Sequence, residues 1–80
     1  MGKLHQIGKI VIRVYADDHP PPHFHVKSPS FEAIIDIKTL AVTRGAISIQ
    51  ARSAVLQWIS VNRAAIVREW NRLNPRFPVR

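Results

Sequence analysis

The first half of the chain alternates apolar and polar side chains, which is typical of β-strands that bury one face. Ile10, Ile12 and Val14 fall on one face of the first such segment, and Lys9, Arg13 and Tyr15 fall on the other. Ser28-Pro29-Ser30 separates two further alternating segments and is a turn signal. The pattern therefore predicts antiparallel strands at about residues 8–16, 23–28 and 31–38.

The second and third segments also predict a hairpin register. A register that pairs Lys27 with Glu32 joins cation to anion and apolar to apolar side chains, which cross-strand energetics favour. It requires a four-residue loop, Ser28 to Phe31. The pairs that follow are Val26 with Ala33, Phe24 with Ile35, and His23 with Asp36. Residues 40–47 are ambiguous, since Leu40 to Thr43 suits a short edge strand and Gly45 a turn.

The second half of the chain reads as a helix. Residues 49–73 contain no Pro or Gly, Ser48 is a plausible N-cap, and Asn74-Pro75 ends the segment. Most apolar side chains cluster in one arc of the helical wheel: Ala51, Val55, Trp58, Ile59, Ile66 and Leu73, with Trp70 at its border. The expected fold is a single α+β domain over residues 1–80. It has a three- or four-stranded antiparallel sheet, one long or kinked helix packed on it, and a tail at 75–80.

Composition excludes several classes of protein. Eighty residues allow one ordinary domain, and the absence of cysteine rules out disulfides, thiolate zinc sites and a cysteine nucleophile. The longest apolar run has four residues, Ala64 to Val67, so we expect no membrane span. The N-terminal residues lack the apolar core of a signal peptide, and we expect a cytoplasmic protein.

The net charge of +7 is unevenly spread along the chain. Residues 1–40 carry only +1, whereas residues 41–80 carry +6, and every basic residue of that half is arginine. Guanidinium groups suit phosphate and carboxylate recognition. One interpretation is a solvated helix face. The other is a surface for nucleic acid or an acidic protein, and its candidate residues are Arg52, Arg63, Arg68 and Arg72.

Three of the four histidines lie within seven residues, in Asp17-Asp18-His19-Pro20-Pro21-Pro22-His23-Phe24-His25. In a strand, His23 and His25 point the same way, with Cα atoms roughly 6.5 Å apart. With His19 and a carboxylate from Asp17, Asp18 or Asp36, they could hold a divalent metal such as zinc. The same histidines could act as acid and base in RNA cleavage, or serve only to pin the hairpin. His5 is expected in a frayed terminus and has no predicted role.

The run from Tyr15 to Val26 resembles the signature of the domain of unknown function 4160 family of small bacterial proteins. The positions that fit are His19, Pro21, Pro22, His23, Phe24, His25, Gly45, Trp58 and Trp70, so the resemblance covers about residues 7–72. It implies a two-gene, toxin–antitoxin-like setting, because the genes often lie beside those of another small-protein family. Two positions depart from the family pattern. Asn62 stands where a histidine is common, and Ala65 stands where an acidic residue is common.

These observations support two hypotheses. The first is a small basic interaction protein, one component of a toxin–antitoxin-like module, that binds an acidic protein or RNA or DNA through its arginine-rich half. The alternative is a ribonuclease, another phosphodiesterase or a metal-binding protein that uses His19, His23 and His25, with Asp36 as a further metal ligand. Exposed sheet edges would be covered in a homodimer.

Overall fold

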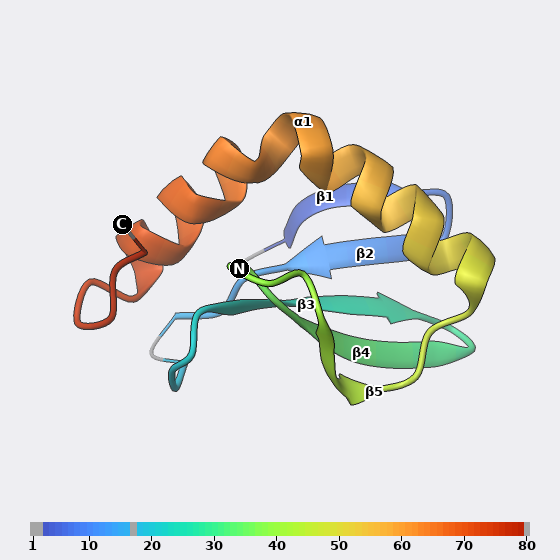
Figure 1. The fold of residues 1–80 in the computed structure, drawn as a ribbon, viewed down its shortest axis with the longest axis horizontal. Helices are drawn as coiled ribbons and strands as arrows, with labels where there is room; N and C mark the ends of the chain where they lie inside the picture. The colour runs from blue at the N-terminus through green and yellow to red at the C-terminus, as the bar shows by residue number, and fades with distance from the viewer. Residues whose placement is uncertain (1–2, 17, 80) are drawn as a thin grey trace.

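A five-stranded antiparallel sheet and one long helix make up the computed structural model, which describes residues 3–16 and 18–79 (Figure 1). The strands follow one another in the order β1-β2-β3-β4-β5, so each pairs with its neighbours in the sequence. The α+β prediction is confirmed, with five strands instead of three or four. The elements are β1 (Lys3–Ile7), β2 (Ile10–Arg13), β3 (His23–Ser28), β4 (Phe31–Asp36), β5 (Val42–Gly45) and α1 (Ile49–Leu73).

The central hairpin of β3 and β4 has the predicted register. Lys27 pairs with Glu32, Phe24 with Ile35, and His23 with Asp36. Ser28 also pairs with Phe31, so the connection is tighter than the expected four-residue loop. This register places Phe24, Val26, Ala33 and Ile35 on the same buried face.

The outer strands differ from the sequence prediction. The first predicted strand, at 8–16, is the shorter β2, which forms a hairpin with β1 through a turn at Gly8, where φ is +57°. β1 was not predicted, because five residues without clear alternation give no signal on their own. The ambiguous segment is β5, and β1 and β5 are the sheet edges. The homodimer that would cover such edges stays a prediction.

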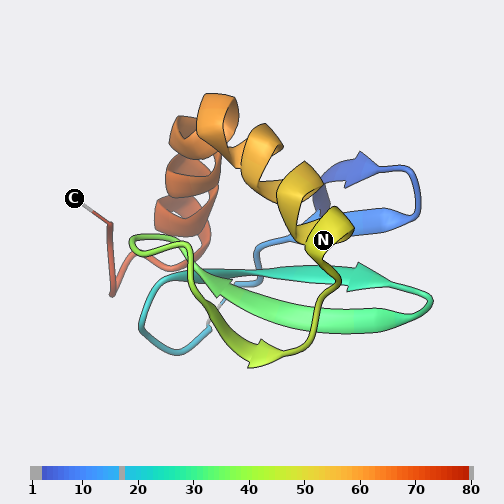
Figure 2. The same cartoon turned by 45° about the vertical axis from the view of Figure 1, so that its right-hand side comes forward.

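Helix α1 bends in its middle and arches over one face of the sheet (Figures 1 and 2). The hydroxyl of Ser48 accepts the Ala51 amide at 3.1 Å and caps the first turn, as predicted. The bend is at Asn62, whose backbone leaves the helical region and whose amide donates to the Trp58 carbonyl at 2.9 Å. The bend lets both halves of the helix follow the twisted sheet.

The core fills the space between the helix and one face of the sheet. The strands and the residues directly after them contribute Ile12, Val14, Phe24, Val26, Ala33, Ile35 and Ile37, and the helix contributes Val55, Ile59, Ile66 and Trp70. Full burial of one large aliphatic side chain is worth about 1.5–3 kcal/mol, so this interface holds the helix in place. Within residues 3–16 and 18–79, no helix has the length and apolar character that a membrane crossing requires.

His5 contributes to this interface, which corrects the expectation of a frayed terminus without a role. Its ring stacks on Trp58 of the helix, with ring centroids 4.7 Å apart and planes 13° from parallel. β1 is therefore attached to α1 as well as to β2.

Candidate metal centre

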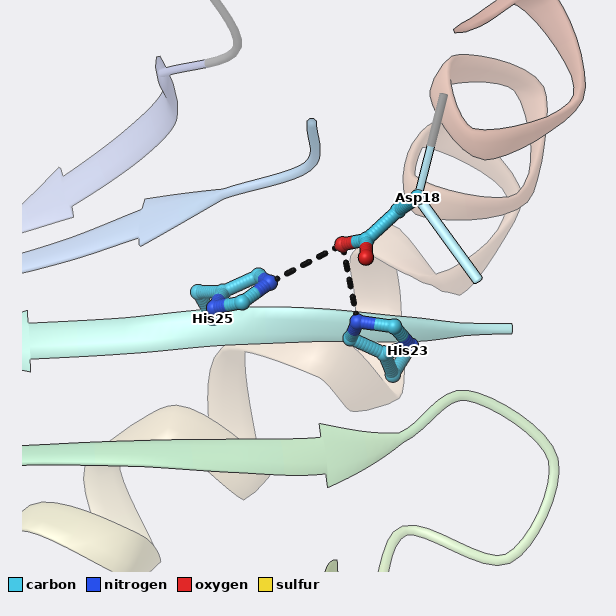
Figure 3. Close-up of side chains that lie close together, drawn as sticks. All are labelled: Asp18, His23 and His25. Carbon is cyan, nitrogen blue, oxygen red and sulfur yellow. Dashed lines mark hydrogen bonds and ion pairs between the residues drawn. The ribbon is translucent and has the colours of Figure 1, made fainter. Parts of the chain in front are cut away.

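Two histidines and one aspartate converge where the β2–β3 loop enters the sheet (Figure 3). His23 and His25 are two residues apart in β3, so their rings lie on the same side of the strand. Asp18 comes from the loop, and its Oδ2 lies 2.9 Å from His23 Nε2 and 3.1 Å from His25 Nε2. One donor atom from each residue lies within 4.8 Å of the other two.

The protonation of His23 follows from its second ring nitrogen. Nδ1 lies 2.7 Å from the Pro21 carbonyl oxygen, which can only accept a hydrogen bond, so Nδ1 carries a proton. In the neutral ring Nε2 then presents a lone pair toward Asp18. The His23 side chain is 4% exposed, and although Nε2 lies 2.9 Å from Oδ2, this buried nitrogen makes no hydrogen bond of acceptable geometry. An unsatisfied buried nitrogen against a carboxylate calls for a cation.

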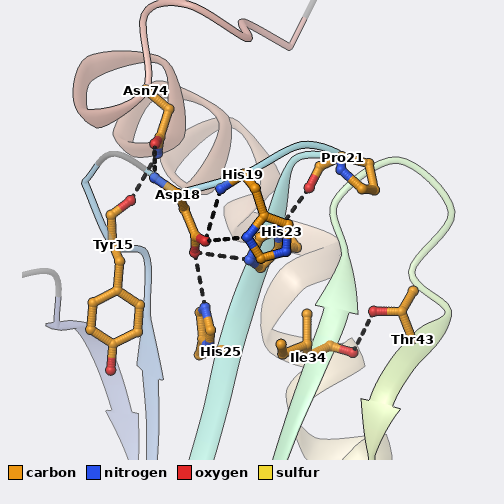
Figure 4. A network of polar contacts seen from close by, with 9 residues as sticks. All are labelled: Tyr15, Asp18, His19, Pro21, His23, His25, Ile34, Thr43 and Asn74. Atoms are coloured by element: carbon orange, nitrogen blue, oxygen red, sulfur yellow. Dashed lines mark hydrogen bonds and ion pairs between the residues drawn. The ribbon is translucent and has the colours of Figure 1, made fainter.

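The loop that carries Asp18 is fixed by the end of the helix (Figure 4). Asn74, which is buried, accepts the Asp18 amide at 2.7 Å through Oδ1 and donates to the Tyr15 carbonyl at 2.8 Å through Nδ2. The Asn74 side chain thus binds two loop residues, Asp18 and Tyr15, that lie 56 and 59 positions before it in the sequence. In the sequence Asn74 is recognisable only as part of a helix stop signal, since nothing local indicates this long-range contact.

The carboxyl group of Asp18 stays ionised more readily than an ordinary aspartate. Burial raises its pKa, but hydrogen bonds from the His25 ring and the His19 amide, together with the positive charge of His23 and His25 in their protonated forms, lower the pKa further than burial raises it. The net pKa lies below its usual value. A carboxylate held in its charged form beside two imidazoles is a suitable metal ligand.

The other predicted ligands lie differently. The His19 side chain is 76% exposed, and its Nδ1 lies 3.2 Å from Asp18 Oδ1. His23 and His25 contact the other carboxylate oxygen, Oδ2. Asp36 closes its own turn, because its Oδ1 accepts the amides of Lys38 at 2.7 Å and Thr39 at 2.9 Å. Asp17 lies outside the described residues. The structure therefore brings Asp18 to the histidines, and it does not bring Asp36 there.

A small cavity of about 180 Å³ opens beside the centre. His19 and His23 line it on one side, and Asp36 and Arg44 line it from β4 and β5. It is large enough for water and a small anionic group, and it gives the edge of the centre access to solvent.

The arginines of the helix do not lie at this centre. Arg52 and Arg68 are exposed, while the guanidinium of exposed Arg63 donates to the Ile37 carbonyl at 3.4 Å. Arg72 forms an ion pair with Glu69 at 2.7 Å. Asn62, which stands where the family often has a histidine, donates its side-chain amide to the Trp58 carbonyl within the helix.

One protein family matches the chain. Its sequence model, described as domain of unknown function (DUF4160), aligns with residues 10–71, which include all three residues of the centre. Neither the curated proteins nor the solved structures contain a significant match.

Proposed function

Since the chain belongs to the DUF4160 family, whose description assigns no activity, we propose a function from the site itself: the protein binds a divalent transition metal, zinc first, through Asp18, His23 and His25. The observation that carries the proposal is the buried Nε2 of His23, which has no hydrogen bond and lies 2.9 Å from a carboxylate oxygen.

A metal ion satisfies this arrangement better than a proton does. A proton on His23 Nε2 would neutralise one contact, between His23 and Asp18. A metal would engage the lone pairs of His23, His25 and Asp18 together. Ligand atoms around one zinc lie roughly 3.3 Å apart, and the observed separations of 2.9 and 3.1 Å need to widen only slightly.

Three protein ligands leave a coordination position open, which is the pattern of catalytic zinc sites. When bound there, zinc lowers the pKa of a coordinated water and polarises phosphoryl or carbonyl oxygens. His19 and Arg44 line the adjacent cavity, where His19 can exchange protons with a substrate and Arg44 can hold an anionic group. Cleavage of RNA, the enzymatic alternative raised by the sequence, fits this arrangement.

Titration of tag-free, chelator-stripped protein with zinc tests the proposal, with isothermal calorimetry as the readout. We expect one zinc per chain. His23→Ala, His25→Ala and Asp18→Asn should each weaken binding at least about hundredfold, because each removes a direct ligand. His5→Ala is the matched control, since its ring stacks on Trp58, and it should bind zinc within twofold of the wild type.

The metal proposal fails if wild-type protein binds no zinc, cobalt or nickel, or if the three ligand variants bind as well as His5→Ala. In the first case the centre consists only of the contacts of Asp18 with the two histidines. A second assay incubates RNA and zinc with either wild-type protein or His25→Ala and measures RNA cleavage, which separates catalysis from metal binding. Cleavage by both proteins would remove the centre from the reaction.

A second candidate is a basic cytoplasmic interaction protein in a toxin–antitoxin-like module. Its support is the exposure of Arg52, Arg63 and Arg68; among the described residues, only Arg72 of the four candidate arginines forms an ion pair. A pull-down of the neighbouring gene product at low salt tests this candidate, with the wild type compared with the variant Arg52→Gln/Arg63→Gln/Arg68→Gln. Capture by the wild type alone supports the proposal, and equal capture refutes it.

A further inference from the structure

The face of the sheet that α1 does not cover carries its own row of cations. Lys9, Arg13 and Lys27 line a groove of about 430 Å³ along β2 and β3, together with Tyr15. The groove contains no acidic residue in its lining. All three cations belong to the half of the chain whose net charge is only +1, so a count along the sequence does not reveal them.

The strand register explains how these cations gather. Side chains two residues apart share a face of a strand, which puts Val11, Arg13 and Tyr15 on the same side. Arg13 pairs with His25 across the sheet, and Val11 pairs with Lys27. The groove therefore runs directly to His25, a residue of the candidate metal centre.

The cations of the groove are available to an anion. No ion pair involves Lys9, Arg13 or Lys27 within the part of the chain that the structure describes. Glu32 lies opposite Lys27 in the register and on the same face of the sheet, but it forms no ion pair with Lys27, and it lines a neighbouring cavity together with His25 and Arg44. Arg44 on β5, paired with Ile34, adds another cation on the same face, three strands from Arg13.

Tyr15 gives the groove an aromatic platform. Tyr15 is 40% exposed, and its ring packs edge to face with the His25 ring, with centroids 4.6 Å apart. A positively charged groove that follows a backbone, with an aromatic ring on which a base stacks, is the general design of single-strand binding surfaces. An acidic peptide would use the cations and leave the exposed ring without a matching group.

We propose that this groove binds single-stranded nucleic acid, with phosphates against Lys9, Arg13 and Lys27 and a base stacked on Tyr15. The proposal goes beyond metal binding and does not depend on it. If both hold, the groove delivers a phosphodiester to the side of the metal centre.

Fluorescence anisotropy with a labelled single-stranded RNA of twelve uridines tests the groove, over a series of salt concentrations. EDTA is present throughout, so loss of zinc binding cannot mimic loss of RNA binding. Arg13→Gln/Lys27→Gln should weaken binding at least about tenfold and reduce the slope of log K against log salt by about 1.4, since each single-strand phosphate contact contributes about 0.7. Tyr15→Leu should weaken binding at least about fivefold.

The matched control is Arg52→Gln/Arg68→Gln, which removes the same two charges from the exposed side of α1. It should bind RNA within about twofold of the wild type. Circular dichroism checks that each variant is folded, and Lys9→Gln/Lys27→Gln replaces the first variant if Arg13 proves necessary for folding.

Three results would overturn the proposal. Equal losses in the groove and helix variants would mean that net charge alone attracts RNA. Wild-type affinity in the groove variant would place RNA elsewhere or nowhere. A polyglutamate peptide that binds as tightly as RNA, with the same dependence on Arg13 and Lys27, would assign the groove to an acidic protein.

Discussion

Asn74→Ala separates the positioning of the metal-binding loop from the stability of the whole domain. The amide of Asn74 makes two hydrogen bonds, one to the Asp18 N–H at 2.7 Å and one to the Tyr15 carbonyl at 2.8 Å. Both partners lie in the β2–β3 loop, and Asn74 itself is buried. Removing the amide leaves two backbone groups unpaired and releases the residue that supplies the carboxylate.

The expected loss of stability follows from these two bonds. A hydrogen bond contributes about 0.5–1.5 kcal/mol, so Asn74→Ala should cost about 2 kcal/mol of unfolding free energy. In a domain of 80 residues this lowers the Tm by about 8–16 °C. Zinc affinity should also fall, by about 10- to 100-fold, because a group that orients a ligand typically has an effect of that size.

Asn71→Ala is the matched control. Asn71 lies in the last turn of α1, which directly precedes the capping Asn74, and also makes two side-chain hydrogen bonds, from its Nδ2 to the Val79 carbonyl at 3.1 Å and from the Val79 N–H to its Oδ1 at 2.7 Å. These bonds hold the C-terminal tail and do not touch the loop. Asn71→Ala should therefore cost similar stability and leave zinc affinity within twofold.

Thermal melts of the metal-free proteins and zinc calorimetry at 20 °C measure the two effects separately. If Asn74→Ala loses stability and keeps its zinc affinity, Asn74 does not position Asp18. If Asn71→Ala loses zinc affinity to the same extent, the effect comes from general destabilisation. If neither variant is less stable, the hydrogen-bond argument itself is wrong.

Two further predictions concern parts of the molecule away from the centre. The hydrogen bond from Arg72 lowers the pKa of Glu69 below its ordinary value of 4.5, so the pair stabilises the fold above that pH and loses its effect as pH falls through the lower, folded-state pKa. Arg72→Ala should raise the pKa of Glu69 in an NMR titration, and an unchanged pKa would contradict the ion pair. Gly45→Ala should destabilise the protein at least about 2 kcal/mol more than Gly8→Ala in urea unfolding, because both glycines have positive φ but only at Gly45 would a Cβ collide with the Glu32 carbonyl. Equal losses would refute the steric argument.

The parts of the fold that were predictable are those in which two independent signals agree. The β3–β4 register that places Lys27 opposite Glu32 also places Phe24 opposite Ile35, and the structure has this register. The helix bounds follow from an unbroken segment without Pro or Gly. β1 was missed because its stability comes from β2 and from the stacking of His5 on Trp58, which are tertiary contacts.

The candidate site was only half predictable. The spacing of His23 and His25 within a strand places both rings on one side, and this is a local property. The choice of carboxylate is not local. Asp36 is opposite His23 in the register, yet its own turn captures it through the amides of Lys38 and Thr39. Asp18 reaches the histidines because Asn74, far along the chain, holds its backbone.

The difference between local sequence properties and the folded arrangement also applies to the charge pattern. Dividing the chain at residue 40 assigns almost all excess charge to the helical half, because the sum treats every side chain of a segment alike. A strand instead sorts its side chains by parity, so Arg13 and Lys27 reach one face while apolar neighbours are buried on the other. Two of the acids of that half contact other groups, Asp18 at the histidines and Asp36 in its own turn, and Glu32 lies opposite Lys27 without an ion pair to it. A nearly neutral segment can thus present a basic face. For this protein, the salt dependence of RNA binding by the groove variant, compared with that of the helix variant, measures which of the two basic surfaces contacts a polyanion.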